Sequence, residues 1–239
     1  GAKYHNVTVE CMGMVNVSDG ICAVDKLVFK DKKYTLEEMS AAVKNNFEGY
    51  TKMRQKMLHG KAKYGRDMEE VIDLTQKILD TVETCCKQNK TSLGGNFKFG
   101  LSSPSYIDAG KISGATPDGR KNAEPFSTHI SCADGIAYTE LLQFASRLDY
   151  SGAKFNGNVV DFMVTPTFLR KNIDKFVVFL KQSIKLGFFE MQMNVVDSET
   201  LIAAKKDPEA FPNLIVRVWG FSAYFKDLPD EYKDVLIKR

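Results

Sequence analysis

The segment 214–225, LIVRVWGFSAYF, contains a residue whose position suggests chemistry at the backbone itself. It begins as a strand in which Leu214, Val216 and Val218 share one face, and Gly220 then interrupts the run between the chain's only tryptophan and Phe221. Glycine weakens a strand interior, so it marks a bulge, a tight turn or a close approach of another group to the backbone. The pattern therefore predicts either a hairpin tip or a backbone site that something else must reach.

The side chains that commonly carry out catalysis are few and irregularly placed. The five cysteines are odd in number, which argues against a disulfide framework and favours a reducing compartment, and the three histidines show no metal-ligand spacing. We therefore expect no metal site. The cysteines and histidines of the chain are Cys11, Cys22, Cys85, Cys86, Cys132, His5, His59 and His129. Cys85 and Cys86 could form a redox pair, but Cys85 falls on the apolar stripe of a predicted helix, which favours a structural role.

A glycine-rich segment, GATPDGR at 114–120, could hold a phosphate through its backbone and its arginine. It lacks the GxxxxGK[ST] pattern, and it is not preceded by a strand and followed by a helix as a dinucleotide site would be. A turn-forming loop is therefore the favoured interpretation.

The elements that must position these residues alternate between helix and strand. Hydrophobic periodicity predicts strands at 3–11, 159–165 and 189–195, and helices at 16–29, 35–60, 67–85, 166–187 and 199–206. Thr35 with Glu38, and Asp67 with Glu70, have capping-box spacing, and either Asp197 or Ser198 would cap the helix at 199–206. The segment 94–134 is rich in loop-forming residues. With no repeat or linker, residues 1–239 are expected to form a single α/β region with covered strands.

Composition excludes several classes of partner. The 33 basic and 30 acidic residues are spread evenly and give a net charge of +3, so we expect no nucleic-acid or anionic-membrane surface. No apolar run reaches membrane-spanning length, and the first ten residues lack the features of a signal peptide. A cytoplasmic protein is the expectation.

Several motifs occur together in one order: GAKYHN at the start, NNFEGY and KYGRD in the helical part, GATPDGRKNAEP in the loop region, and a long final stretch from QMNVVDSETL to RVWGFSAYF. Across essentially the whole chain they resemble the glycyl radical enzymes, the family of pyruvate formate-lyase and the glycerol and choline lyases. The resemblance implies that Gly220 stores a backbone radical. It also implies the fold, the C-terminal half of a ten-stranded α/β barrel with a glycine-finger loop, in which residues 190–239 form the glycine radical domain.

The same resemblance implies roles for residues around the loop and for partners. No bound cofactor is expected, because an activating enzyme with an iron-sulfur cluster and S-adenosylmethionine would install the radical, which the barrel would enclose. Arg217 is expected to pair with a carboxylate. The expected loop-supporting residues are Arg217, Trp219, Phe221, Ser222, Tyr224, Gln192 and Asn194, with Phe225 as a further aromatic wall, and the expected substrate-pocket residues are Val160, Phe162 and Val164.

The family also needs a cysteine loop upstream of the Gly-Ala-x-Tyr-Asn segment, and this chain begins at that segment. None of its five cysteines has the matching setting. The sequence therefore looks like the C-terminal part of a longer enzyme, or one half of a split enzyme, acting on a small molecule by dehydratase, lyase or decarboxylase chemistry. A spare-part subunit that repairs an oxygen-damaged partner enzyme and a catalytically silent relative remain alternatives. Exposed strand edges and apolar residues would favour association with another chain or with itself.

Overall fold

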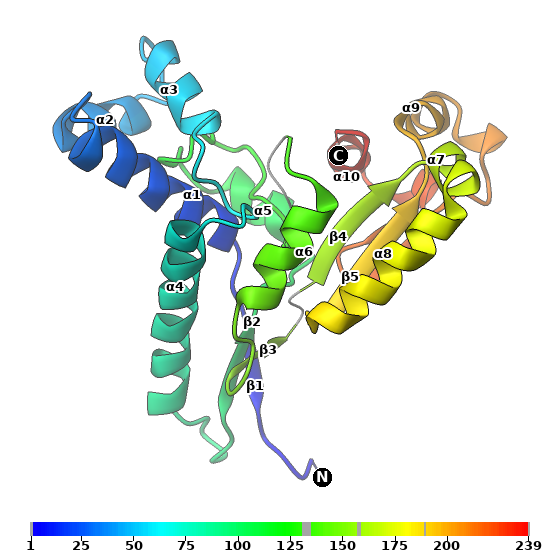
Figure 1. The fold of residues 1–239 in the computed structure, drawn as a ribbon, viewed down its shortest axis with the longest axis horizontal. Coiled ribbons are helices and arrows are strands. Elements are labelled where there is room, and N and C mark those ends of the chain that lie inside the picture. Colours follow the sequence, from blue (N-terminus) through cyan, green and yellow to red (C-terminus); the bar gives the residue numbers. More distant parts are fainter. Residues whose placement is uncertain (1, 131–134, 157–158, 189, 239) are drawn as a thin grey trace.

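The computed structural model describes residues 2–130, 135–156, 159–188 and 190–238 and has an α/β architecture (Figure 1). Its N-terminal part contains strands β1 (Val7–Glu10), β2 (Phe97–Gly100) and β3 (Lys154–Asn156), helices α1 (Met14–Val24), α2 (Leu36–Lys44), α3 (Thr51–Leu58) and α4 (Glu69–Gln88), and the π-helical turn η1 (Asp25–Lys30). Helices α5 (Tyr106–Lys111) and α6 (Tyr138–Arg147) follow before β3. The C-terminal part contains β4 (Val159–Val164), α7 (Pro166–Lys171), α8 (Ile173–Leu186), β5 (Glu190–Val195), α9 (Ser198–Lys206), β6 (Ile215–Val218), β7 (Phe221–Tyr224) and α10 (Asp230–Ile237), with short 3-10 turns at Pro208–Ala210 and Phe225–Asp227.

The strands of the described residues form three small sheets. Strands β1, β2 and β3 pair in parallel, β4 and β5 pair in parallel, and β6 and β7 form an antiparallel hairpin. Parallel pairs joined by helices are typical of α/β folds, so the expected fold class is confirmed at that level. These sheets do not close into a barrel by themselves, and the barrel stays a prediction.

The structure corrects the predicted boundaries of the helix at 35–60 and the predicted cap of α4. The helix expected at 35–60 is split into α2 and α3, because Asn46 and Phe47 adopt positive φ and the Phe47 side chain is buried in the core. The Thr35 and Glu38 capping box is present. Asp67 does not cap α4; it accepts a hydrogen bond from Arg147 at 3.0 Å, and the cap position is Met68.

Two other helices also depart from the predicted pattern. The helix expected at 16–29 is α1 followed by the π-helical turn η1, and Ile21 within α1 is exposed. The helix expected at 166–187 breaks at Asn172 into α7 and α8, although Gly187 ends it in the left-handed conformation as glycine stop signals do. Asp197, rather than Ser198, caps α9.

The apolar side chains gather in three clusters. One joins α1, α4, α6 and the strands β2 and β4, another joins η1, α2 and α3, and the last surrounds the β6–β7 hairpin with α5, α9 and α10. Figure 1 shows α8 lying along β4 and β5, and its Phe179 packs against the first cluster together with Met191 and Met193 of β5. The hairpin therefore sits on its own hydrophobic cluster, beside the β4–β5 pair.

Candidate functional site

The hairpin around Gly220 has a two-residue turn. Val218 pairs with Phe221, which leaves Trp219 and Gly220 at the tip with φ of 28° and 103°. Positive φ at both central residues is the pattern of a type I′ turn, whose backbone twist matches that of the two flanking strands. A β-carbon at Gly220 would meet nothing within 4 Å, so backbone conformation rather than crowding favours glycine here. Gly220 is exposed, and the expected enclosure is not formed by the described residues of this chain.

The aromatic residues of the hairpin divide into two pairs. Trp219 is 2% exposed and packs against Tyr106 of α5 and Tyr232 of α10, with ring centroids 5.9 Å and 5.1 Å away. Phe225 is buried in the same cluster. Phe221 and Tyr224 were expected to wall the loop, but both are exposed in this chain because they lie on β7, which pairs only with β6 among the described strands.

Two amides on β5 connect the hairpin to the β4–β5 sheet. The Asn194 side chain donates from Nδ2 to the carbonyl of Arg217 at 2.9 Å, and its Oδ1 accepts from the backbone N–H of Arg217 at 2.7 Å. Gln192 Oε1 accepts from Arg217 Nε at 3.1 Å and from the backbone N–H of Gly220 at 3.4 Å. Asn194 thus takes the place of a strand partner for β6, and Gln192 contacts the glycine itself.

The hairpin decides which face of β5 is buried. Gln192 and Asn194 are the buried side chains, whereas Met191 and Met193 are only half-buried. The side chains alternate as predicted for a strand, but the hairpin covers the polar face, and the buried amides are stable there because their hydrogen bonds are made.

Within the part of the chain that the structure describes, Arg217 lacks the carboxylate partner that we expected. Among the described residues its guanidinium donates to Gln192 and, from Nη1, to the hydroxyl of Ser222 at 3.4 Å. Because Ser222 lies opposite Arg217 in the hairpin, the arginine spans the two strands next to the turn.

Residues that sequence reasoning did not select lie behind Gln192. Gln192 Nε2 donates to Asp161 Oδ1 of β4 at 2.5 Å, and Asp161 Oδ2 is 3.7 Å from Nε2 of the buried His129. The hydroxyl of Tyr106 is 3.3 Å from His129 Nδ1 and accepts from the His129 backbone N–H. Asp161 is the acidic residue within the otherwise apolar VVDFMV strand, and that contrast is the sequence signal that could have identified it.

The expected substrate-pocket residues, Val160, Phe162 and Val164, lie in the first hydrophobic cluster. The Phe162 ring packs edge to face against Tyr138 and Phe179, at 4.6 Å and 5.7 Å. Their observed contacts in this chain are those of core packing, and a pocket role stays a prediction.

The described cysteines are free, and Cys132 lies outside the described residues. In α4 it is Cys86, not Cys85, that is buried, so the predicted stripe is displaced by one residue. Burial raises the pKa values of Cys11 and Cys86, and it raises that of Cys22 to about 11. Thiols with raised pKa are poor nucleophiles, which fits structural roles for these three.

The GATPDGR segment forms a turn, as predicted. Gly119 has a φ of 99°, and Arg120 is buried, donates to the backbone carbonyls of Gly114 and Glu124, and stacks over Phe126 at 4.3 Å. Its guanidinium is thus engaged by its own loop. No group of three metal-ligating side chains occurs among the described residues.

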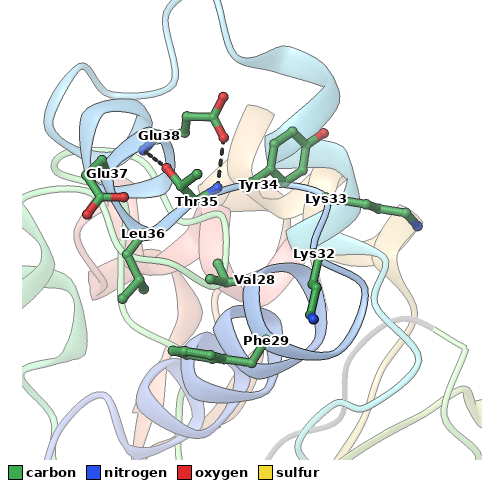
Figure 2. A pocket seen from close by; sticks show the side chains of 9 residues that line it. All are labelled: Val28, Phe29, Lys32, Lys33, Tyr34, Thr35, Leu36, Glu37 and Glu38. Carbon is green, nitrogen blue, oxygen red and sulfur yellow. Dashed lines mark hydrogen bonds between the residues drawn. The ribbon is translucent and has the colours of Figure 1, made fainter.

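A surface pocket of about 470 Å³, which shares no lining residue with this hairpin, lies between η1 and the start of α2 (Figure 2). Figure 2 shows that Thr35 and Glu38, its central polar residues, bond to each other's backbone N–H groups in the capping box. The hydrogen bonds of these two residues thus serve the start of α2 and give no sign of a ligand site. Separately, no helix within the described ranges is both long and apolar enough to span a bilayer.

Comparisons with known proteins agree on one family. The family model "Pyruvate formate lyase-like" matches residues 1–107, and "Glycine radical" matches residues 125–226, which include the hairpin. The isethionate sulfite-lyase of Oleidesulfovibrio alaskensis is 34% identical over 96% of this chain and 28% of that protein.

Solved structures show the same similarity. The B12-independent glycerol dehydratase from Clostridium butyricum superposes with a TM-score of 0.92 at 30% identity, over all of this chain and 31% of that one. A glycyl radical enzyme from Archaeoglobus fulgidus gives 0.91 at 27% identity, with the same coverage. The chain thus spans between 28% and 31% of the length of these relatives. Sequence, family models and fold together show that this chain belongs to the glycyl radical enzyme family.

Proposed function

We propose that this chain supplies the radical-storing residue, Gly220, of an enzyme that cleaves C–C or C–X bonds of a small molecule without oxygen, by dehydratase, lyase or decarboxylase chemistry. The observation that carries the proposal is the position of Gly220 at the hairpin tip inside the stretch that matches the glycine radical model. Relatives named as a sulfite-lyase and a glycerol dehydratase support this type of reaction.

The chemistry explains the requirement for glycine. Loss of one α-hydrogen leaves an unpaired electron that is shared with the two flanking amide groups, and this sharing needs a flat α-carbon that a β-carbon would crowd. The exposed tip gives an activating enzyme, with its iron-sulfur cluster and S-adenosylmethionine, access to that hydrogen. The Gly220 radical then takes the hydrogen atom of a cysteine thiol, which restores the glycine Cα–H bond, and the resulting thiyl radical takes a hydrogen atom from the substrate.

The proposal assigns that cysteine, and the enclosure of Gly220, to the remainder of the enzyme or to a partner chain. Coverage of 28% to 31% of the relatives' length supports this division. Residues 190–239 act as the glycine radical domain within this scheme. In the closed enzyme Phe221 and Tyr224 become covered and wall the loop.

Electron paramagnetic resonance tests the proposal. After anaerobic incubation with the cognate activating enzyme, S-adenosylmethionine and a reductant, the chain is expected to give a doublet, because the electron couples to the one remaining α-hydrogen. Incorporation of glycine deuterated at the α-carbon should collapse the doublet, and Gly220→Ala should abolish it.

Gly187→Ala is the matched control. Gly187 also has positive φ, 76°, and space for a β-carbon, but it ends α8, so its replacement introduces similar backbone strain without touching the hairpin. Its doublet should equal that of the unmodified chain. An unchanged doublet in Gly220→Ala would show that the radical resides elsewhere.

A further inference from the structure

Asp161 is an acidic residue in the middle of an apolar strand. It lies between Val160 and Phe162 of β4, and its side chain is 7% exposed. A carboxylate removed from water is costly unless hydrogen bonds compensate it. The contacts of the Asp161 carboxylate therefore indicate what compensates its burial.

The backbone brings Asp161 to Gln192. The two residues are partners in the parallel register of β4 and β5, and their side chains lie on the same face of that pair. Gln192 Nε2 is 2.5 Å from Asp161 Oδ1, while Asp161 Oδ2 is directed to His129 at 3.7 Å. The side-chain contact is thus set by strand register.

This contact determines which way the Gln192 amide faces. An amide has a donating end and an accepting end, whereas a carboxylate can only accept. The NH2 group must therefore face Asp161, and Oε1 must face the hairpin, where Arg217 Nε and the Gly220 N–H donate to it at 3.1 Å and 3.4 Å. With the amide reversed, the NH2 group would meet these two donors.

We propose that Asp161 is a positioning residue for Gly220: it fixes the orientation of the Gln192 amide, and that amide holds the Gly220 N–H and keeps the hairpin tip docked on β5. The proposal gives a function to a charge that core packing does not need. It deepens the proposed function, because the held residue is the one assigned to the radical, but the contact exists in the chain without any radical.

An exchange of donor and acceptor tests the assignment. At pH 8.5, Gln192→Glu places two carboxylates in contact, and the hairpin should undock. Asp161→Asn combined with Gln192→Glu restores the pair in reverse, since the new asparagine donates to the new glutamate, which still accepts from Arg217 and Gly220. Backbone amide exchange of the 214–225 peptide, measured by mass spectrometry, reports docking. Acrylamide quenching of the sole tryptophan, Trp219, reports it independently.

We expect the ratio of docked to undocked hairpin to fall roughly tenfold in Gln192→Glu, within the range found for coupled neighbours, and to recover in the double variant. Asp161→Asn alone should give an intermediate fall, because asparagine accepts either orientation of Gln192. Gln143→Glu, on the exposed part of α6, is the control for an added charge and should leave exchange unchanged.

Wild-type exchange in Gln192→Glu, or a double variant no better than the single, would overturn the proposal. If Gln192→Glu unfolds as a whole, seen as faster exchange in α4 as well, the double variant decides: a restored fold supports the pair and an unfolded one refutes it. Because no radical is involved, the exchange test can fail while the Gly220 doublet is observed. Equally, the doublet can be absent while the exchange test succeeds.

Discussion

At the scale of single residues, the tip of the hairpin combines strain with anchoring. Trp219 adopts a φ of 28°, which is unusual for a bulky residue, while its indole is buried between Tyr106 and Tyr232. Such conformations persist where surrounding contacts determine them. Burial of the tryptophan therefore fixes the turn, and the turn presents Gly220 outward.

Asn194 should matter for stability as well as for position. Asn194→Leu leaves the partly buried N–H and carbonyl of Arg217 without their partner, so we expect a loss in the free energy of unfolding on the order of 1–3 kcal/mol. Urea denaturation followed by circular dichroism measures this loss. Asn213→Leu, at an exposed position before β6, is the control and should change stability little. Equal stability of the two variants would show that the amide bridge does not hold the hairpin.

At the scale of elements, α4 is joined to β3 by a charge cluster. Glu83 of α4 accepts from the Ala153 backbone N–H at 2.9 Å and from Lys154 Nζ at 3.2 Å, and it pairs with Lys87 at 2.9 Å. These hydrogen bonds, with that of the backbone first, lower the pKa of Glu83 to about 2. The carboxylate therefore stabilises the contact between helix and strand.

This cluster predicts a pH dependence of stability. Because the folded pKa of Glu83 lies below its unfolded value, the stabilisation is fully present above about pH 4.5 and is lost as pH falls toward 2. Glu83→Gln should remove this part of the acid dependence and cost on the order of 1–3 kcal/mol at pH 7, since charged hydrogen bonds are replaced by neutral ones.

Urea denaturation of the wild type and of Glu83→Gln at pH 7 and pH 3 tests this pH dependence. The difference in stability between wild type and Glu83→Gln should shrink at pH 3. A constant difference would mean that the Glu83 charge does not contribute. Glu48→Gln, on an exposed turn, provides the matched control.

At the scale of the molecule, the chain exposes apolar surface that its own residues do not cover. On α8, Ile173, Val178 and Ile184 are 52%, 56% and 77% exposed, and Val7 and Val9 of β1 are exposed as well. Large uncovered apolar areas and open strand edges mark surfaces that pair with other segments. This agrees with a chain that spans less than a third of its relatives' length.

We therefore expect the chain to associate with itself or with the remainder of the enzyme. Sedimentation velocity over a range of concentrations should show a rising average mass, and Val178→Glu with Ile184→Lys should reduce it. The charge reversal Lys181→Glu on the same helix is the control. A sharp monomer at every concentration would contradict the expectation.

Local signals in the sequence determined much of the structure. The Thr35 cap, the Gly187 stop, the alternation of β4 and β5 and the glycine-interrupted strand before Phe221 each depend on neighbours a few residues away, so they could be predicted. The family followed from motifs that retain their order along the chain. The position of Gly220 in a turn was part of that prediction.

Only the tertiary structure decided which faces are covered. The polar face of β5 is buried because the hairpin packs on it, Phe47 breaks a predicted helix because its ring enters the core, and Asp161 meets Gln192 because two strands 31 positions apart share a register. The exposure of Gly220 was also decided there. These outcomes depend on contacts between segments distant in sequence, whose energies no local pattern of residues contains.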